Sequence, residues 1–203
     1  MNDQDLAAQI KSVARRIGIR GPLPVARMVS PTEMVAASSD PARPAGAKIW
    51  SSGELWWSEA CPVTESGLVH ELSHWLLATS ASAPLFPHHH DADVDGHGAL
   101  FAALAWALTA RAGTVPNHQQ YDLGHAYKPG DRPADPLEER WARRWAWRPH
   151  SGTTAEALAA GAIRDYRRWC QARALVAAAV PFLRLLAALA AAISVPALLA
   201  HMI

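Results

Sequence analysis

The alternation of apolar and polar residues along the 203-residue chain predicts an initial helix, a small sheet and further helices. In the first segment, apolar residues recur every three or four positions, as on one face of an amphipathic helix. These residues are Leu6, Ile10, Val13 and Ile17. Short apolar runs beside turn-forming residues predict strands at 23–30, 48–51 and 54–58. The segment after the first strand is rich in Pro, Ser and Ala, and we predict a loop there.

Two more helices are predicted after the sheet. The first contains an apolar stripe formed by Leu68, Leu72, Trp75 and Leu76. The second covers residues 98–111, with the sequence GALFAALAWALTAR. A loop of roughly twenty residues separates them, and long loops inside compact domains usually have a function. This order of elements predicts an α+β fold.

The composition is that of a globular protein, because 50% of the residues are hydrophobic and 18% are charged. The net charge of +1 provides no overall attraction to nucleic acid. Cys61 and Cys170 are too few to build a zinc ribbon, and we expect two thiols. The first residues contain no apolar signal segment, so a cytoplasmic location is expected.

The segment His70-Glu71-Leu72-Ser73-His74 matches the pattern H-E-x-x-H and falls on a predicted helix. Residues i and i+4 of a helix lie one turn apart on the same face, so both imidazoles can bind one Zn²⁺. The intervening glutamate lies beside the metal, where it can accept a proton from a zinc-bound water with a pKa of about 7. The pattern therefore predicts a catalytic zinc site with Glu71 as the general base.

A third protein ligand is needed, because a catalytic zinc ion normally has three and keeps one position open. We favour His97, which stands at the start of the second predicted helix between Gly96 and Gly98, two residues that let the backbone approach closely. The alternatives lie in the preceding loop and are His88, His89, His90, Asp91, Asp93 and Asp95. The candidates for stabilising the oxyanion are His118, Tyr121, His125 and Tyr127.

The segments VHELSHWL and DGHGALFAAL resemble the core of the SprT-like and related minimal zincins, over roughly residues 5–112. Those proteins carry H-E-x-x-H on one helix and a third histidine in an HGxxF or HGxxW sequence that opens the next. The resemblance implies zinc-dependent hydrolysis of a protein or peptide substrate. The residues that it implies are the ligands His70, His74 and His97, the base Glu71, and the packing aromatic Phe101. The zinc ribbon that often follows this core has no counterpart, because the chain lacks the cysteines.

Residues 137–173 are rich in arginine and aromatic side chains. The basic residues are Arg140, Arg143, Arg144, Arg148, Arg164, Arg167, Arg168 and Arg173, and the aromatic ones are Trp141, Trp145, Trp147, Tyr166 and Trp169. Such side chains can stack on unpaired bases and pair with phosphates, so nucleic acid is one candidate partner. The other interpretation is a pair of amphipathic helices in which Trp141 and Trp145 face the core.

The apolar tail, residues 174–203, contains one formal charge, Arg184. This charge leaves ten residues before it and sixteen between it and His201, fewer than the ~20 needed to cross a bilayer. The larger apolar residues fall on one helical face, which favours packing on the domain or oligomerisation. The arginines that precede the tail favour a membrane association instead.

These observations predict a zincin-like core at 1–112, an irregular connection at 113–136, a helical region at 137–173 and a helical tail at 174–203. The expected activity is that of a zinc metallopeptidase. One alternative is a non-catalytic metal-binding protein of zincin fold that binds a partner or nucleic acid. Another is a peptidase tethered to a membrane through its tail.

Overall fold

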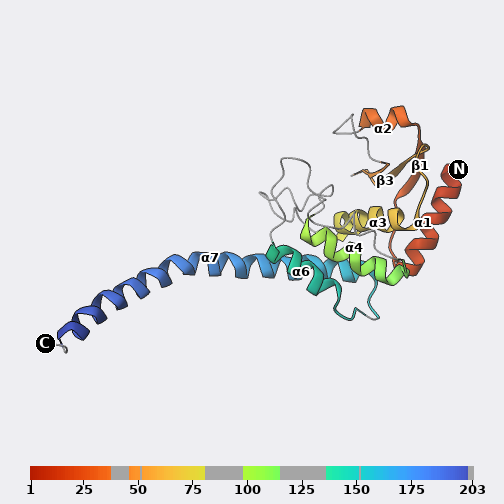
Figure 1. Cartoon of the computed structure of the whole chain (residues 1–203). Coiled ribbons are helices and arrows are strands. Elements are labelled where there is room, and N and C mark those ends of the chain that lie inside the picture. Colours follow the sequence, from red (N-terminus) through yellow and green to blue (C-terminus); the bar gives the residue numbers. More distant parts are fainter. Residues whose placement is uncertain (38–45, 51, 81–97, 115–135, 151, 201–203) are drawn as a thin grey trace. The chain divides into compact units, whose positions relative to one another are not determined.

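The computed structural model describes residues 1–37, 46–50, 52–80, 98–114, 136–150 and 152–200. These residues form six helices and one three-stranded sheet, so the predicted α+β class is confirmed (Figure 1). The helices are α1 (Asp3–Ile17), α2 (Pro31–Ala37), α3 (Glu65–Ser80), α4 (Ala99–Ala112), α6 (Pro136–Ala146) and α7 (Ala155–Ala200). The strands are β1 (Val25–Val29), β2 (Ala47–Ile49) and β3 (Glu54–Ser58).

The described chain forms two compact units, Met1–Ile163 and Arg164–Ile203. The boundary falls inside α7 and within the Arg/Trp-rich region. The apolar tail is therefore the later part of a helix that begins at Ala155. Over Ala155–Leu189, this helix is long and apolar enough to cross a membrane, judged by length and composition alone.

Helix α1 is capped at both ends. Asn2 and Asp5 form a reciprocal capping box, in which each side chain accepts a hydrogen bond from the other residue's backbone N–H. The helix ends at Gly18, whose φ of 87° is left-handed and suits glycine. The four apolar residues that predicted this helix are all buried.

The sheet has the strand order β1-β3-β2, with β1 parallel and β2 antiparallel to β3. The three predicted strands are therefore confirmed, and their pairing is set by long-range contacts. Leu55 and Trp57 of β3 are buried on the side of the sheet that faces the core. Helix α1 contacts β1, and α3 contacts β2. The sheet thus packs against the helix that carries the H-E-x-x-H segment.

Helix α2 corrects the prediction of a loop after the first strand. Ser30 and Glu33 form a capping box, because the Ser30 N–H donates to Oε2 of Glu33 at 2.9 Å and the Glu33 N–H donates to Oγ of Ser30 at 3.3 Å. Pro31 occupies the first helical position, where its missing N–H costs no hydrogen bond. The Ser30 hydrogen bonds hold the pKa of Glu33 below its ordinary value. The capping box favours a helix here more strongly than the Pro and Ser content of the segment favours a loop.

The first turn of α7 is joined to the C-terminal end of α1. One carboxylate oxygen of Glu156 accepts hydrogen bonds from the backbone N–H groups of Arg20 and Gly21, each at 2.7 Å. Arg111 of α4 strengthens the same junction, since its guanidinium donates to the carbonyl oxygens of Ile17 at 3.3 Å and Thr153 at 3.0 Å. These charge-assisted bonds connect segments that are far apart in the sequence.

We expect Glu156→Gln to lower the free energy of unfolding by about 1–2 kcal/mol at pH 7, because it removes a charged acceptor. Burial alone would raise the pKa of Glu156, but the backbone hydrogen bonds from Gly21 and Arg20 outweigh it and lower the pKa below 4.5. A lowered folded pKa contributes stability above the unfolded pKa, and this contribution is lost as the pH falls through the folded value. Urea unfolding of both proteins between pH 7 and pH 3 measures the effect. If the wild type and Glu156→Gln differ in unfolding free energy by the same amount at every pH, the expected pH dependence is contradicted.

Candidate metal centre

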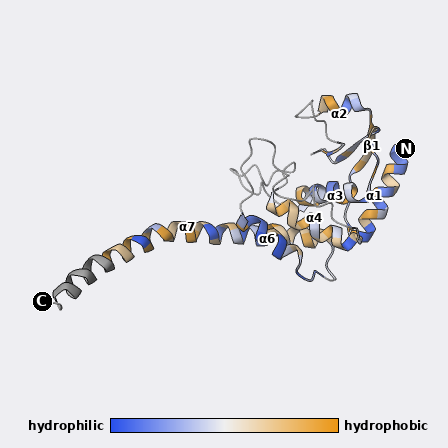
Figure 2. Cartoon of the chain, in the orientation of Figure 1, coloured by the Kyte–Doolittle hydropathy of each residue, from blue (hydrophilic) through white to orange (hydrophobic). Residues whose placement is uncertain are grey.

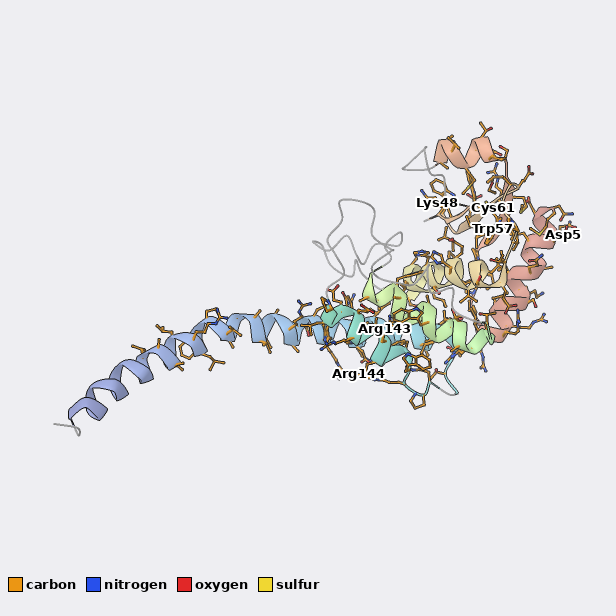
Figure 3. The ribbon with its side chains drawn as sticks, in the orientation of Figure 1. Asp5, Lys48, Trp57, Cys61, Arg143 and Arg144 are labelled. Atoms are coloured by element: carbon orange, nitrogen blue, oxygen red, sulfur yellow. The ribbon has the colours of Figure 1, made fainter. Side chains whose placement is uncertain are left out.

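The start of α3 holds the H-E-x-x-H segment against the sheet. Oγ1 of Thr64 accepts a hydrogen bond from the Gly67 N–H at 3.1 Å, which caps the first turn of the helix. A Cβ at Gly67 would lie 2.7 Å from the indole of Trp57, so glycine allows the helix to approach β3 closely. The indole N–H of Trp57 donates to the Cys61 carbonyl at 3.2 Å, and Figure 3 shows these two residues together in the sheet region. The orientation of α3 on the sheet is thereby set one turn before His70.

The three chemically important residues of α3 lie at the inner side of the helix. Glu71 and His74 are buried, with 8% and 6% of their surface exposed, and His70 is half-buried. The centroids of the two imidazole rings are 5.0 Å apart, with an interplanar angle of 70°. The i, i+4 spacing therefore brings both histidines to one place on the helix, as the sequence predicts.

Phe101, in the first turn of α4, contacts both histidines. Its ring stacks on His74 with centroids 4.2 Å apart, and it meets His70 edge-on at 4.9 Å. Phe101 itself is 1% exposed. Helix α4 packs along α3, and its N-cap is Gly98. The N-terminal end of α4 is thus adjacent to the histidine pair, and the residue before this N-cap is His97.

The predicted third ligand and its alternatives lie outside the described residues. This applies to His97 and to all candidates between 88 and 95, as well as to the oxyanion candidates between 118 and 127. Among the residues that the structure describes, no three His, Cys, Asp or Glu side chains form a group that could hold a metal ion. The described part of the centre is therefore the pair His70 and His74 with Glu71 between them.

The histidine pair has dimensions that fit one zinc ion. Zn–N bonds of about 2.0–2.1 Å at a tetrahedral angle place the centres of two ligating rings about 5 Å apart. The observed separation of the His70 and His74 centroids is 5.0 Å. Two neutral imidazoles are also ligands that Zn²⁺ prefers, and a further histidine is available in the sequence at His97. The donor set and the ring spacing are both suited to the metal.

A groove of about 500 Å³ lies along the later turns of α3. Its walls include Trp75, Thr79, Ile19 and Pro22, and the indole N–H of Trp75 donates to the Pro22 carbonyl at 3.1 Å. The sequence placed Trp75 with the core stripe, whereas it is half-buried and forms one side of this groove. Residues from distant segments build these walls, so no local pattern could have predicted the groove.

The aromatic side chains of α6 are buried or half-buried, whereas Arg140, Arg143 and Arg144 are exposed. Trp145 is 2% exposed, and the Arg143 guanidinium lies 5.2 Å from the Trp106 ring centroid on α4. Arg143 also pairs with Glu139 at 2.8 Å, while Arg144 is exposed on the same helix (Figure 3). Trp147 has 84% of its surface exposed. The buried position of Trp145 agrees with the amphipathic interpretation of this segment.

Comparisons of the chain with protein-family models, with curated proteins and with solved structures found no match.

Proposed function

We propose that this protein is a zinc-dependent metallopeptidase of zincin-like fold, in which His70, His74 and His97 bind the metal and Glu71 is the general base. The observation that carries the proposal is the contact of Phe101 with both histidines of α3. This contact brings the start of α4 to the histidine pair. It supports His97 as the third ligand, because His97 directly precedes the N-cap of α4.

Each residue of the centre has a distinct task. A bound zinc ion would polarise the substrate carbonyl and lower the pKa of a coordinated water to about 7. The Glu71 carboxylate takes a proton from the attacking water and passes it to the leaving amine nitrogen. Burial of Glu71 limits the rotamers of its side chain, which supports a fixed position for the general base. Phe101 restricts both imidazole rings through packing.

The substrate is proposed to be a peptide or an unfolded protein segment, which is the class that the resemblance implies. The main alternative is a protein of the same fold that binds metal without catalysis and contacts a partner or nucleic acid. Metal binding is common to both functions. Hydrolysis separates them, and it must therefore be measured on protein with a known zinc content.

Zinc content tests the proposed ligand set. We expect about one zinc per chain in the tag-free wild-type protein and much less in His97→Ala, because removal of one of three ligands weakens the site strongly. Elemental analysis of both proteins, purified in parallel, measures this. His201→Ala is the matched control, since it removes an imidazole outside the proposed centre and should keep the metal.

Three further substitutions decide between the candidate ligands. If His88→Ala, His89→Ala or His90→Ala loses the zinc while His97→Ala retains it, the third ligand is in the preceding loop and our assignment is wrong. A wild-type protein that takes up no zinc after reconstitution would overturn the proposal as a whole. Wild-type protein that binds zinc and leaves a diverse peptide mixture uncut, as judged by mass spectrometry, would favour the non-catalytic alternative.

A further inference from the structure

The later part of α7 exposes its apolar side chains over residues 174–189. Every residue from 174 to 189 is exposed, and this includes Leu175 at 73% and Phe182 at 63%. Figure 2 shows hydrophobic colour along this stretch of the helix, beyond the hydrophilic residues that precede it. Exposed apolar area of this extent marks an interaction surface.

Several of the larger apolar residues share one face of the helix, as the sequence predicts, but Val176, Val180 and Leu183 lie on other sides, so apolar side chains surround the helix. Each residue is rotated by about 100° from the last, so Leu175, Val180 and Leu185 point at about 0°, 140° and 280° around the helix axis. All three are exposed. A helix that pairs with one partner helix has an apolar stripe and a polar opposite side, whereas a helix that is apolar all round suits lipid. Between 174 and 189, Arg184 is the one charged residue.

A collar of basic and aromatic residues precedes this apolar segment. We define the collar as Arg164, Arg167, Arg168, Trp169 and Arg173, all of which are exposed or half-buried. The ring of Trp169 stacks on the buried ring of Tyr166 with centroids 5.8 Å apart, and the Arg173 guanidinium lies 5.2 Å from the Trp169 ring centroid. Tryptophan and tyrosine concentrate at the headgroup level of membranes, and arginines attract anionic lipid headgroups there. The collar has the chemistry of a membrane interface.

The length of the helix also suits a bilayer. At 1.5 Å per residue, residues 174–200 extend for about 40 Å, close to the thickness of a bilayer with its headgroup regions. Arg184 interrupts this span about 16 Å beyond Arg173 and carries a cost within the bilayer. Helical side chains lean toward the N-terminus, so its long side chain extends toward the collar side and lowers this cost. The helix also contains Pro181 and Pro196, which are more common in membrane-spanning helices than in soluble ones.

We propose that residues 174–200 of α7 cross a lipid bilayer and that the collar binds its anionic headgroups. This inference is independent of the proposed zinc site. Lipid is proposed to cover the exposed apolar surface. The alternative is an assembly in water, in which several copies of the chain cover this surface for one another. A bilayer would cover the apolar side chains on all sides at once, which a single partner helix could not do.

The test uses the full chain, purified in detergent and reconstituted by detergent removal with vesicles of phosphatidylcholine and phosphatidylglycerol. Wild-type protein should float with the vesicles in a density gradient and resist extraction by alkaline carbonate. The double variant Leu185→Asp/Leu186→Asp should reduce the floating fraction about tenfold or more, because two carboxylates are placed within the apolar segment. Trp147→Asp is the matched control, since it changes an exposed apolar residue of the first unit and should still float.

The collar is tested by Arg167→Glu/Arg168→Glu on two kinds of vesicle. We expect weaker binding to vesicles that contain phosphatidylglycerol and little change on pure phosphatidylcholine, because the headgroup attraction is electrostatic. Wild-type protein that stays in the dense fractions as a soluble oligomer of defined mass would overturn the proposal in favour of self-assembly. Equal flotation of the wild type and the Leu185→Asp/Leu186→Asp variant would overturn it as well.

Discussion

Glu71→Gln is expected to keep zinc bound and to lower the rate of peptide hydrolysis by about 10²–10⁴-fold. The amide has nearly the same shape as the carboxylate, so it should fit the same buried position on α3. It cannot accept the proton of the attacking water at neutral pH, and the general-base contribution is therefore lost. The measurements are zinc content by elemental analysis and the initial rate on a quenched fluorescent peptide that the wild-type protein cleaves.

Glu65→Gln is the matched control, because it makes the same chemical change on the same helix. Glu65 forms an ion pair with Arg16 at 2.8 Å, and both side chains are partly exposed, so the loss to stability should be small. Its hydrolysis rate should stay close to that of the wild type. Full activity in Glu71→Gln would show that another group acts as the base. Loss of zinc from this variant would point to a ligand role for Glu71.

Phe101→Ala should lower the free energy of unfolding by about 3–5 kcal/mol. Phe101 is 1% exposed and contacts the rings of His70 and His74, so its removal leaves a cavity between α3 and α4. The loss combines the transfer energy of the ring with the cavity term. Urea denaturation of the metal-free protein, followed by tryptophan fluorescence, measures the effect without a contribution from bound zinc.

Phe101→Leu distinguishes the effect of lost side-chain volume from the effect of lost aromatic contact with the two histidines. Leucine fills most of the space and should cost less than alanine at this position. If the ring also restricts the imidazoles, zinc affinity should fall in both variants, and it should fall further in Phe101→Ala. A loss below about 1 kcal/mol in Phe101→Ala would contradict the tight packing of α3 against α4.

Local spacing in the sequence was sufficient for the elements whose signals lie within one or two turns. The recurrence of Leu6 and Ile10 predicts α1, and the H-E-x-x-H spacing predicts that His70 and His74 share one face of α3. Both features depend on the 3.6-residue period of the helix. The Pro and Ser content of residues 31–37 predicts a loop, whereas the Ser30–Glu33 capping box begins helix α2 there.

The tertiary structure alone decided which distant segments meet. The parallel pairing of β1 with β3, the contact of Phe101 with the histidine pair, and the carboxylate of Glu156 at the end of α1 all join residues separated by many positions. These pairings arise from the packing of apolar surfaces and the satisfaction of buried polar groups. Neither requirement leaves a periodic signal in the sequence. Periodicity therefore determines which residues share a face of an element, and tertiary packing determines what that face contacts.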